Sequence, residues 1–187
     1  MGAKKIGKPV KLVLTRNQMF YMVGYRPYTL QKIGLGANMD GKLVGISHQA
    51  DSITSMYEEF TEGSVNVSKL MYACPNVFTR YHIHPFNVST PTWMRGPGEA
   101  TGTFALESAL DELSYKLKID PVELRLRNYA ESDPETGKPY SSKFLREAFD
   151  LGMEAFGWKK RNAAVGSMKE GNMQVGYGMA TGVFGAF

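Results

Sequence analysis

A leucine repeat in the middle of the chain constrains the fold more than any other feature of the sequence. Leu106, Leu110, Leu113 and Leu117 recur at i, i+4, i+7 and i+11, which is the spacing of one face of an α-helix. The charged residues of the same stretch fall on the other faces of that helix: Glu107, Asp111, Glu112 and Lys116. A helix with one apolar stripe has to bury that stripe against a second element. We expect this element to be a β-sheet.

Extended segments dominate the first half of the chain. Residues 28–55 form two alternating runs on either side of Asp40 and Gly41, a pair that tolerates the positive φ angles of a tight hairpin turn. Residues 77–90, with the sequence VFTRYHIHPFNVST, alternate again. A further strand is expected near the N-terminus, over residues 8–15 with the sequence KPVKLVLT.

Helix signals are concentrated in the second half. Asp120 can cap a helix that begins with a proline, and a later helix is expected to start at Ser141 or Ser142. One short helix is expected earlier, because Thr15 and Gln18 have the spacing of a capping box.

These signals predict a single α+β unit over residues 1–187. It is strand-rich over 8–90, helical over 98–160 and closed by a terminal strand over 172–187. Strands followed by helices favour a twisted mixed or antiparallel sheet with helices packed on one side. The last run is apolar and glycine-rich and has no polar tail, so we expect the chain to be a fragment of a longer protein.

Charge and composition exclude several classes of function. The 22 basic and 18 acidic residues give a formal net charge of +4, and they are spread along the chain, so nucleic acid is not an expected partner. The single cysteine, Cys74, excludes a disulfide and any cluster held by several cysteines of this chain. No run approaches the roughly 18 apolar residues of a membrane span, and the N-terminus lacks the apolar core of a signal peptide. Both the cytoplasm and the periplasm are left open as the cellular compartment of the protein.

One turn has the character of a binding site. Arg95 precedes Gly96, Pro97 and Gly98, which lead directly into the leucine-striped helix. Unpaired N–H groups at the helix start, the helix dipole and the guanidinium would then converge on one small volume that attracts an anion or an oxo group. The alternative is that Arg95 pairs with a surface carboxylate and the glycines only make a turn.

Three other residues could carry chemistry. His82 and His84 alternate on one face of a strand, a pattern compatible with metal ligation, but no third ligand can be placed beside them and Pro85 interrupts the run. Structural roles are favoured for both histidines, and we assign no metal ligand. Cys74 is interpreted as a small buried residue, since no partner histidine can be assigned to it.

Several motifs together resemble one protein family. They are GKPVKLVLTRNQMF near the start, YACPNV before the arginine, PTWMRGPGEATGTFALESALDELSYKLKIDPVELRLRNYAESDPETGKPYSS over residues 91–142, and GYGMATG near the end. The sequence resembles the molybdenum-cofactor-binding large subunit of the xanthine dehydrogenase and aldehyde oxidase family. It is most similar to the bacterial aldehyde-oxidising members, and the resemblance covers nearly the whole chain.

The resemblance implies a molybdenum hydroxylase. In that family a molybdopterin, here expected in its cytosine dinucleotide form, holds the molybdenum, and water supplies the oxygen inserted into an aldehyde. Electrons leave through iron–sulfur and FAD subunits or domains. The resemblance matches Arg95 to the family arginine beside the molybdenum ligands, as a catalytic and cofactor-binding residue, and matches Gly96, Pro97 and Gly98 to the wall of that site.

The same resemblance implies that parts of the site lie outside this sequence. The glutamate base of the family belongs to a later segment, and Glu99 is not its equivalent, because an acidic residue at a helix start simply favours the dipole. Most pterin-contacting segments are also absent. We therefore expect the isolated chain to be inactive and to bind no cofactor.

Two departures from the family bear on the substrate. Purine-oxidising members have an aromatic residue where this chain has Pro97, and an arginine before YACPNV where this chain offers only Lys69. An aldehyde is therefore the expected substrate, with purine or N-heterocycle hydroxylation as the alternative. A different class of function also stays open, namely a non-catalytic α+β scaffold or interaction domain derived from the same fold.

Overall fold

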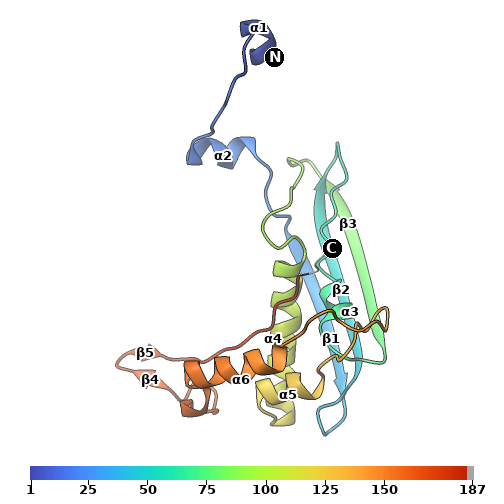
Figure 1. Cartoon of the computed structure of the whole chain (residues 1–187), viewed down its shortest axis with the longest axis vertical. Coiled ribbons are helices and arrows are strands. Elements are labelled where there is room, and N and C mark those ends of the chain that lie inside the picture. Colours follow the sequence, from blue (N-terminus) through green and yellow to red (C-terminus); the bar gives the residue numbers. More distant parts are fainter. Residues whose placement is uncertain (185–187) are drawn as a thin grey trace.

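The computed structural model describes residues 1–184 and has an α+β fold with a mixed three-stranded sheet and helices on one side (Figure 1). This confirms the predicted fold class. The elements that form the body of the molecule are β1 (Thr29–Ala37), β2 (Leu43–Ser55), α3 (Val67–Leu70), β3 (Val77–Phe86), α4 (Glu99–Leu117), α5 (Pro121–Arg127) and α6 (Leu145–Phe156).

The sheet has the order β1-β2-β3 and mixes both strand directions. β1 and β2 form the predicted antiparallel hairpin, in which Gly41 has φ 84°. β2 and β3 run parallel, joined by the crossover that contains α3. β3 continues through Pro85, which pairs with Thr54. The expectation that Pro85 interrupts the strand is therefore wrong, because an edge strand tolerates a missing N–H donor.

The two faces of the sheet differ in their surroundings. Alternate residues of β2 point toward the helices and are buried, among them Ile46, His48 and Ala50. The opposite face is largely exposed among residues 1–184, and it carries apolar side chains such as Leu30 and Phe78, which are 63% and 55% exposed. The helices therefore cover one face only, as predicted.

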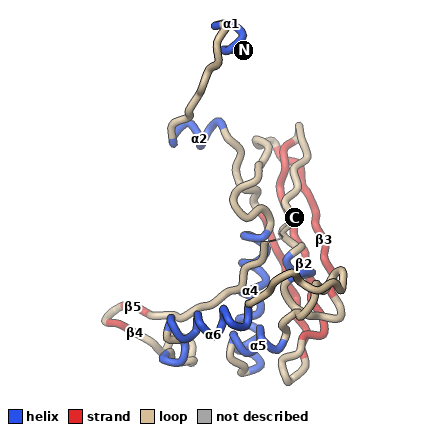
Figure 2. Tube along the Cα trace, viewed as in Figure 1, coloured by secondary structure: helices blue, strands red, loops and turns tan. Residues whose placement is uncertain are grey.

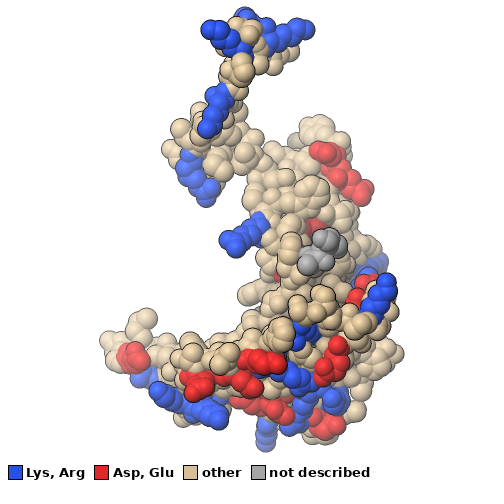
Figure 3. Space-filling view, in the orientation of Figure 1, with Lys and Arg blue, Asp and Glu red and all other residues tan. Residues whose placement is uncertain are grey.

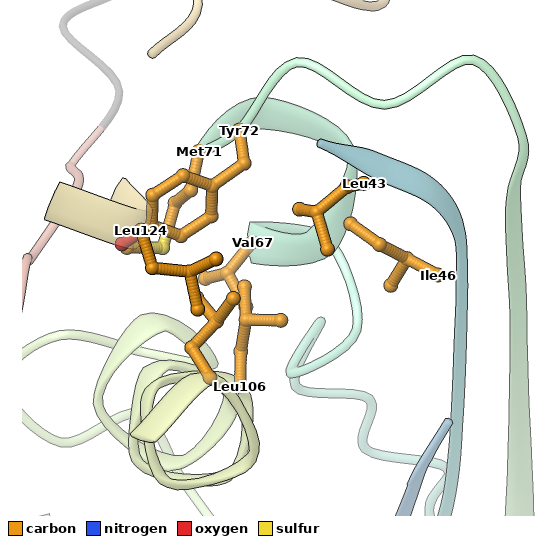
Figure 4. Close-up of a cluster of buried hydrophobic side chains, with 8 residues drawn as sticks. Leu43, Ile46, Val67, Met71, Tyr72, Leu106 and Leu124 are labelled. Carbon is orange, nitrogen blue, oxygen red and sulfur yellow. The ribbon is translucent and has the colours of Figure 1, made fainter. Parts of the chain in front are cut away.

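The core lies between β2, α3, α4 and α5 (Figure 4). Leu106 and Leu110 of the predicted stripe are fully buried, while Leu113 and Leu117 pack against the edge of the cluster. Leu124 of α5 completes this side of the core. The other buried apolar members are Leu43, Ile46, Val67, Met71 and Tyr72.

The N-terminal segment departs from the prediction. Residues 8–15 are extended but form no strand, and they connect two short helices, α1 (Gly2–Ile6) and α2 (Arg16–Met22), on an arm outside the body (Figure 1). An alternating pattern predicts an extended chain, but a strand also needs a hydrogen-bonded neighbour. Leu12 is 79% exposed. The expected capping box of α2 is present, with Thr15 and Gln18 bonded reciprocally.

The third helix starts later than predicted. Asp120 does cap α5, accepting from the N–H of Val122 at 2.8 Å. α6, however, begins at Leu145 and not at Ser141 or Ser142. Two residues before the helix, Nζ of Lys143 donates to the Ala130 carbonyl at 2.7 Å, which ties this connection to the body of the molecule.

The C-terminal region contains η1 (Trp158–Lys160) and a two-stranded hairpin, β4 (Lys169–Glu170) and β5 (Met173–Gln174). The predicted terminal strand over 172–187 is reduced to β5, because the glycine-rich run after it continues as a loop that passes α6 and α4 (Figure 2). Residues 185–187 of that prediction lie outside the described residues. Residues 175–184 of this loop form no strand, and the Thr181 N–H donates to Glu107 of α4 at 2.8 Å.

Charged side chains are mixed on the molecular surface. On the face in Figure 3, basic and acidic residues are intermixed over the helices, whereas the charged residues of the N-terminal arm are all Lys or Arg. Within residues 1–184, no helix combines the length and apolar character that crossing a membrane requires.

Candidate functional site

The Arg95 turn connects the sheet to α4 through two glycines in the left-handed region. Gly96 has φ 68° and Gly98, the N-cap of α4, has φ 81°. A Cβ on Gly98 would approach the backbone carbon of Gly63 to 2.7 Å, so this position needs glycine for packing as well as for conformation. Pro97 lies between the two glycines and fixes one further φ angle of the turn.

An arginine from the segment before β1 holds this turn in place. Arg26 donates from Nη2 to the carbonyl oxygen of Arg95 at 2.6 Å and from Nη1 to that of Gly96 at 3.2 Å. The same Nη1 lies 3.3 Å from Oε1 of Glu62, whose side chain is fully buried. Because all three contacts link distant parts of the chain, the backbone of the turn is fixed independently of the Arg95 side chain.

The carboxyl group of Glu62 lies beside the N-terminus of α4, where it accepts from the Gly98 N–H. Burial raises the pKa of its carboxyl group, against the opposing effects of Arg26 and of the Gly98 N–H. A protein carboxylate therefore already lies where the sequence predicted an open anion site at the helix N-terminus. The Gly98 N–H is thus occupied by Glu62, so at this position no free N–H joins the Arg95 guanidinium as expected.

The Arg95 side chain points instead toward an open groove. Arg95 is exposed, and among residues 1–184 its guanidinium takes part in no hydrogen bond or ion pair. The expected alternative of a pair with a surface carboxylate is therefore not observed. The groove has a volume of about 1050 Å³ and is lined by residues 94–97, by one side of α4 and by part of the C-terminal loop, 179–184. Pro97 lines it as well as Arg95 and Gly96, whereas the buried Gly98 does not.

A buried charge network fixes another part of the groove wall, which includes Glu107 and Asp111. Glu107 of α4 accepts at 2.8 Å from Nε of Arg125 and at 2.8 Å from the backbone N–H of Thr181. Its other oxygen accepts from the Tyr72 hydroxyl. Arg125 also lies 2.9 Å from Asp111. This network anchors the C-terminal loop against α4 and so shapes the groove.

Sequence reasoning missed this network. The helical pattern placed Glu107 on a solvent face, yet it is only 4% exposed, and Arg125 is 1% exposed. A glutamate next to the buried Leu106 was the available signal. A second polar residue of the groove is Glu99, whose Oε2 is buried and has no hydrogen-bond partner among the described residues.

The two histidines of β3 do meet a third potential ligand. Asp51 of β2 is the register partner of His82, and its Oδ1 lies 2.7 Å from Nε2 of His84. The hydrogen bond from His84, together with the nearby His82 and Arg80, lowers the pKa of the Asp51 carboxyl group. This cluster lies on the sheet face opposite the groove. Cys74 is half-buried and donates to a backbone carbonyl 3.4 Å away.

Comparison with known proteins identifies the family. Residues 1–129 match the molybdopterin cofactor-binding domain. The chain belongs to this family. It is 38% identical over 183 residues to the aldehyde oxidoreductase molybdenum-binding subunit PaoC of Escherichia coli (strain K12), covering 97% of this chain and 25% of that protein. It is 35% identical over 187 residues to the putative xanthine dehydrogenase molybdenum-binding subunit XdhA of the same organism, covering 96% of this chain and 25% of that protein.

A solved structure has the same fold. Quinoline 2-oxidoreductase from Pseudomonas putida 86 aligns with a TM-score of 0.71 and 19% identity, covering 84% of this chain and 22% of that one. The molybdopterin cofactor-binding fold is thus shared at low sequence identity. The chain spans about a quarter of the length of the curated relatives it matches.

Proposed function

We propose that this chain contributes one wall of the cofactor site in a molybdenum hydroxylase that oxidises aldehydes. The observation that carries the proposal is the Arg95 guanidinium, which has no protein partner among the described residues and lines a groove of about 1050 Å³ beside a rigid turn. The family match and the 38% identity to an aldehyde oxidoreductase subunit support this assignment.

The polar groups of the groove suit a molybdenum–pterin cofactor. Arg95 offers two parallel N–H donors for phosphate or oxo oxygens, and the unpartnered oxygen of Glu99 offers an acceptor for N–H groups such as those of a pterin ring. When bound, the cofactor supplies the two-electron oxidation and the oxygen transfer that amino acids cannot perform. We propose the cytosine dinucleotide form.

The residues of the chain would then act by binding and orientation. Arg95 donates hydrogen bonds to an oxygen that gains negative charge, and such a preorganised donor stabilises the transition state more than the ground state. Gly96 and Pro97 allow the ligand to approach the backbone of the turn. Arg26 and Glu62 fix the turn from behind, so no binding energy is lost in ordering it.

The substrate and the partners are also proposals. Pro97 stands in the groove wall where an aromatic residue would stack on a purine, which favours an aldehyde. In the complete enzyme the electrons would pass to iron–sulfur and FAD subunits or domains; the single residue Cys74 cannot supply the ligands of such a cluster from this chain. Purine or N-heterocycle hydroxylation is the second candidate, favoured by the 35% identity to XdhA.

The test uses the complete protein that contains this sequence, purified from its source. Metal analysis and acid release of the nucleotide measure the cofactor, and dye reduction measures turnover of aldehydes and of hypoxanthine. About one molybdenum per chain with aldehyde turnover supports the proposal. Turnover of hypoxanthine alone selects the second candidate. A protein without molybdenum and without either activity would instead indicate the non-catalytic scaffold.

A further inference from the structure

We propose that Asp51, His82 and His84 form a surface binding site for a divalent transition metal, with Zn²⁺ as the expected ion. The three side chains project from two neighbouring strands, and one potential ligand atom of each lies within 4.8 Å of the others. This site lies on the exposed face of the sheet, away from the Arg95 groove, and does not depend on the molybdenum cofactor.

The sheet itself brings the ligands together. His82 and His84 are two positions apart on β3, so they point to the same side of the sheet. Asp51 lies opposite His82 in the parallel pairing of β2 and β3, and residues paired in this way share a face. Because β2 hydrogen-bonds to strands on both sides, the backbone positions of all three ligands are fixed before any ion binds.

The distances suit a small tetrahedral ion. Zinc binds imidazole nitrogen and carboxylate oxygen at about 2.0–2.2 Å, so two ligand atoms at a tetrahedral angle lie about 3.3 Å apart. Oδ1 of Asp51 lies 2.7 Å from Nε2 of His84 and 3.8 Å from Nδ1 of His82. These values lie on either side of the required separation. Small rotations of half-exposed side chains would equalise them, with water in the remaining position.

Arg80 competes with the ion. Its Nε donates to Nε2 of His82 at 3.0 Å, an arrangement that leaves the proton of a neutral imidazole on Nδ1. Metal binding through Nδ1 requires that proton to leave, with Nε2 carrying the proton instead. The Arg80 hydrogen bond must then break. Loss of Arg80 is therefore expected to strengthen binding, which gives a test that removes no ligand.

The composition of the chain allows the site to be isolated. The sequence contains only three histidines, and the third, His48, is fully buried with both nitrogens in hydrogen bonds. Replacing Cys74 by serine removes the single thiol. Any remaining binding of Zn²⁺ through imidazole must then come from His82 and His84.

Isothermal titration of Zn²⁺ into the 187-residue Cys74→Ser chain, in a buffer that does not bind metals, tests the proposal. One ion should bind per chain, and the double variant His82→Asn/His84→Asn should lose that binding. Asp51→Asn should weaken binding roughly tenfold or more, because even outer-shell changes weaken metal sites by about this factor. The exposed Asp150→Asn is the matched control and should bind as the parent does.

Arg80→Gln tests whether Arg80 competes with the ion for His82. The variant keeps every ligand and should bind Zn²⁺ more tightly than the parent. Circular dichroism checks that each variant keeps the parent fold, as expected for exposed side chains. Three results would overturn the proposal: no saturable binding by the parent, unchanged binding by the double histidine variant, or unchanged binding by Asp51→Asn.

Discussion

Nη2 of Arg26 donates a 2.6 Å hydrogen bond to the carbonyl oxygen of Arg95, although 69 residues separate the two in sequence. Arg26 thus fixes the backbone at Arg95, and the Arg95 guanidinium is left to face the groove. The rigidity of the turn and its chemistry belong to different residues, so they can be tested separately.

Arg26→Gln should lower stability and disorder the turn. Loss of the guanidinium leaves Glu62, whose side chain is fully buried, without its partner. Hydrogen bonds to charged groups contribute about 1.5–3 kcal/mol, and we expect a loss of that order in the free energy of unfolding, measured with urea. Adding Glu62→Gln should recover part of the loss, because the unpaired buried charge is then removed. Equal stability of the parent and Arg26→Gln would contradict the role.

The two glycines of the turn should respond differently to alanine. Gly96→Ala places a Cβ in the left-handed region but meets only Ala100 at 3.5 Å, so we expect a loss of about 1–2 kcal/mol. Gly98→Ala adds an overlap with the Gly63 backbone at 2.7 Å, which should add roughly 1–3 kcal/mol. Urea denaturation of the two single variants measures the difference between their free energies of unfolding. Equal losses would show that packing on Gly63 is unimportant.

The elements that depend on near neighbours in sequence were predictable. The hairpin at Asp40 and Gly41, the leucine-striped helix and the Asp120 cap need only local spacing, and all three are present. The strand expected over residues 8–15 failed because the alternating pattern cannot show whether a partner strand exists.

The candidate sites show the same limit. The position of Arg95 follows from its motif, but its surroundings depend on contacts between residues far apart in sequence, such as that of Arg26 with the turn. Likewise, the third potential ligand beside His82 and His84 could not be found, because Asp51 reaches them only through the parallel register of β2 and β3. A single sequence does not specify that register.

Arg125→Met should be among the most destabilising single substitutions in the chain. Arg125 is 1% exposed and Glu107 is 4% exposed, so the change leaves a buried carboxylate without its cation, at a loss of about 3–5 kcal/mol. Arg125→Lys should rescue little, because an ammonium group cannot make the same set of bonds. Arg146→Met is the control, since its pair with Glu131 is exposed and should contribute about 1 kcal/mol at most. Similar unfolding free energies for the Arg125 and Arg146 variants would contradict this account.

His48 should make stability depend on pH. Burial lowers its pKa from 6.5 to about 4, so between these values the unfolded chain binds a proton that the folded chain does not. The resulting stability is fully present above pH 6.5 and is lost as the pH falls toward 4, by up to about 3 kcal/mol.

The control for this pH effect is His48→Gln, which cannot titrate in this range. Its own stability should be lower, because Gln cannot reproduce both hydrogen bonds to Ser68 and Gln31. The difference in unfolding free energy between parent and variant, measured by urea from pH 4 to pH 7.5, should grow with rising pH. A constant difference would show that His48 is protonated equally in both states.

Arg95 should be important for activity and unimportant for stability. Its guanidinium is exposed and has no protein partner among residues 1–184, so Arg95→Ala should change the unfolding free energy of this chain by no more than about 0.5 kcal/mol. In the complete enzyme the same variant should lower kcat by about 10²-fold or more, the usual effect of removing one preorganised donor to a developing negative charge. Arg95→Lys should recover little of that loss, because a single ammonium group does not present two parallel donors.

Steady-state kinetics with an aldehyde, with molybdenum content measured for each variant, separate loss of turnover from loss of cofactor. If both variants keep their full molybdenum content and near-normal kcat, Arg95 does not act on the reacting oxygen, and the free guanidinium must serve another ligand of the groove.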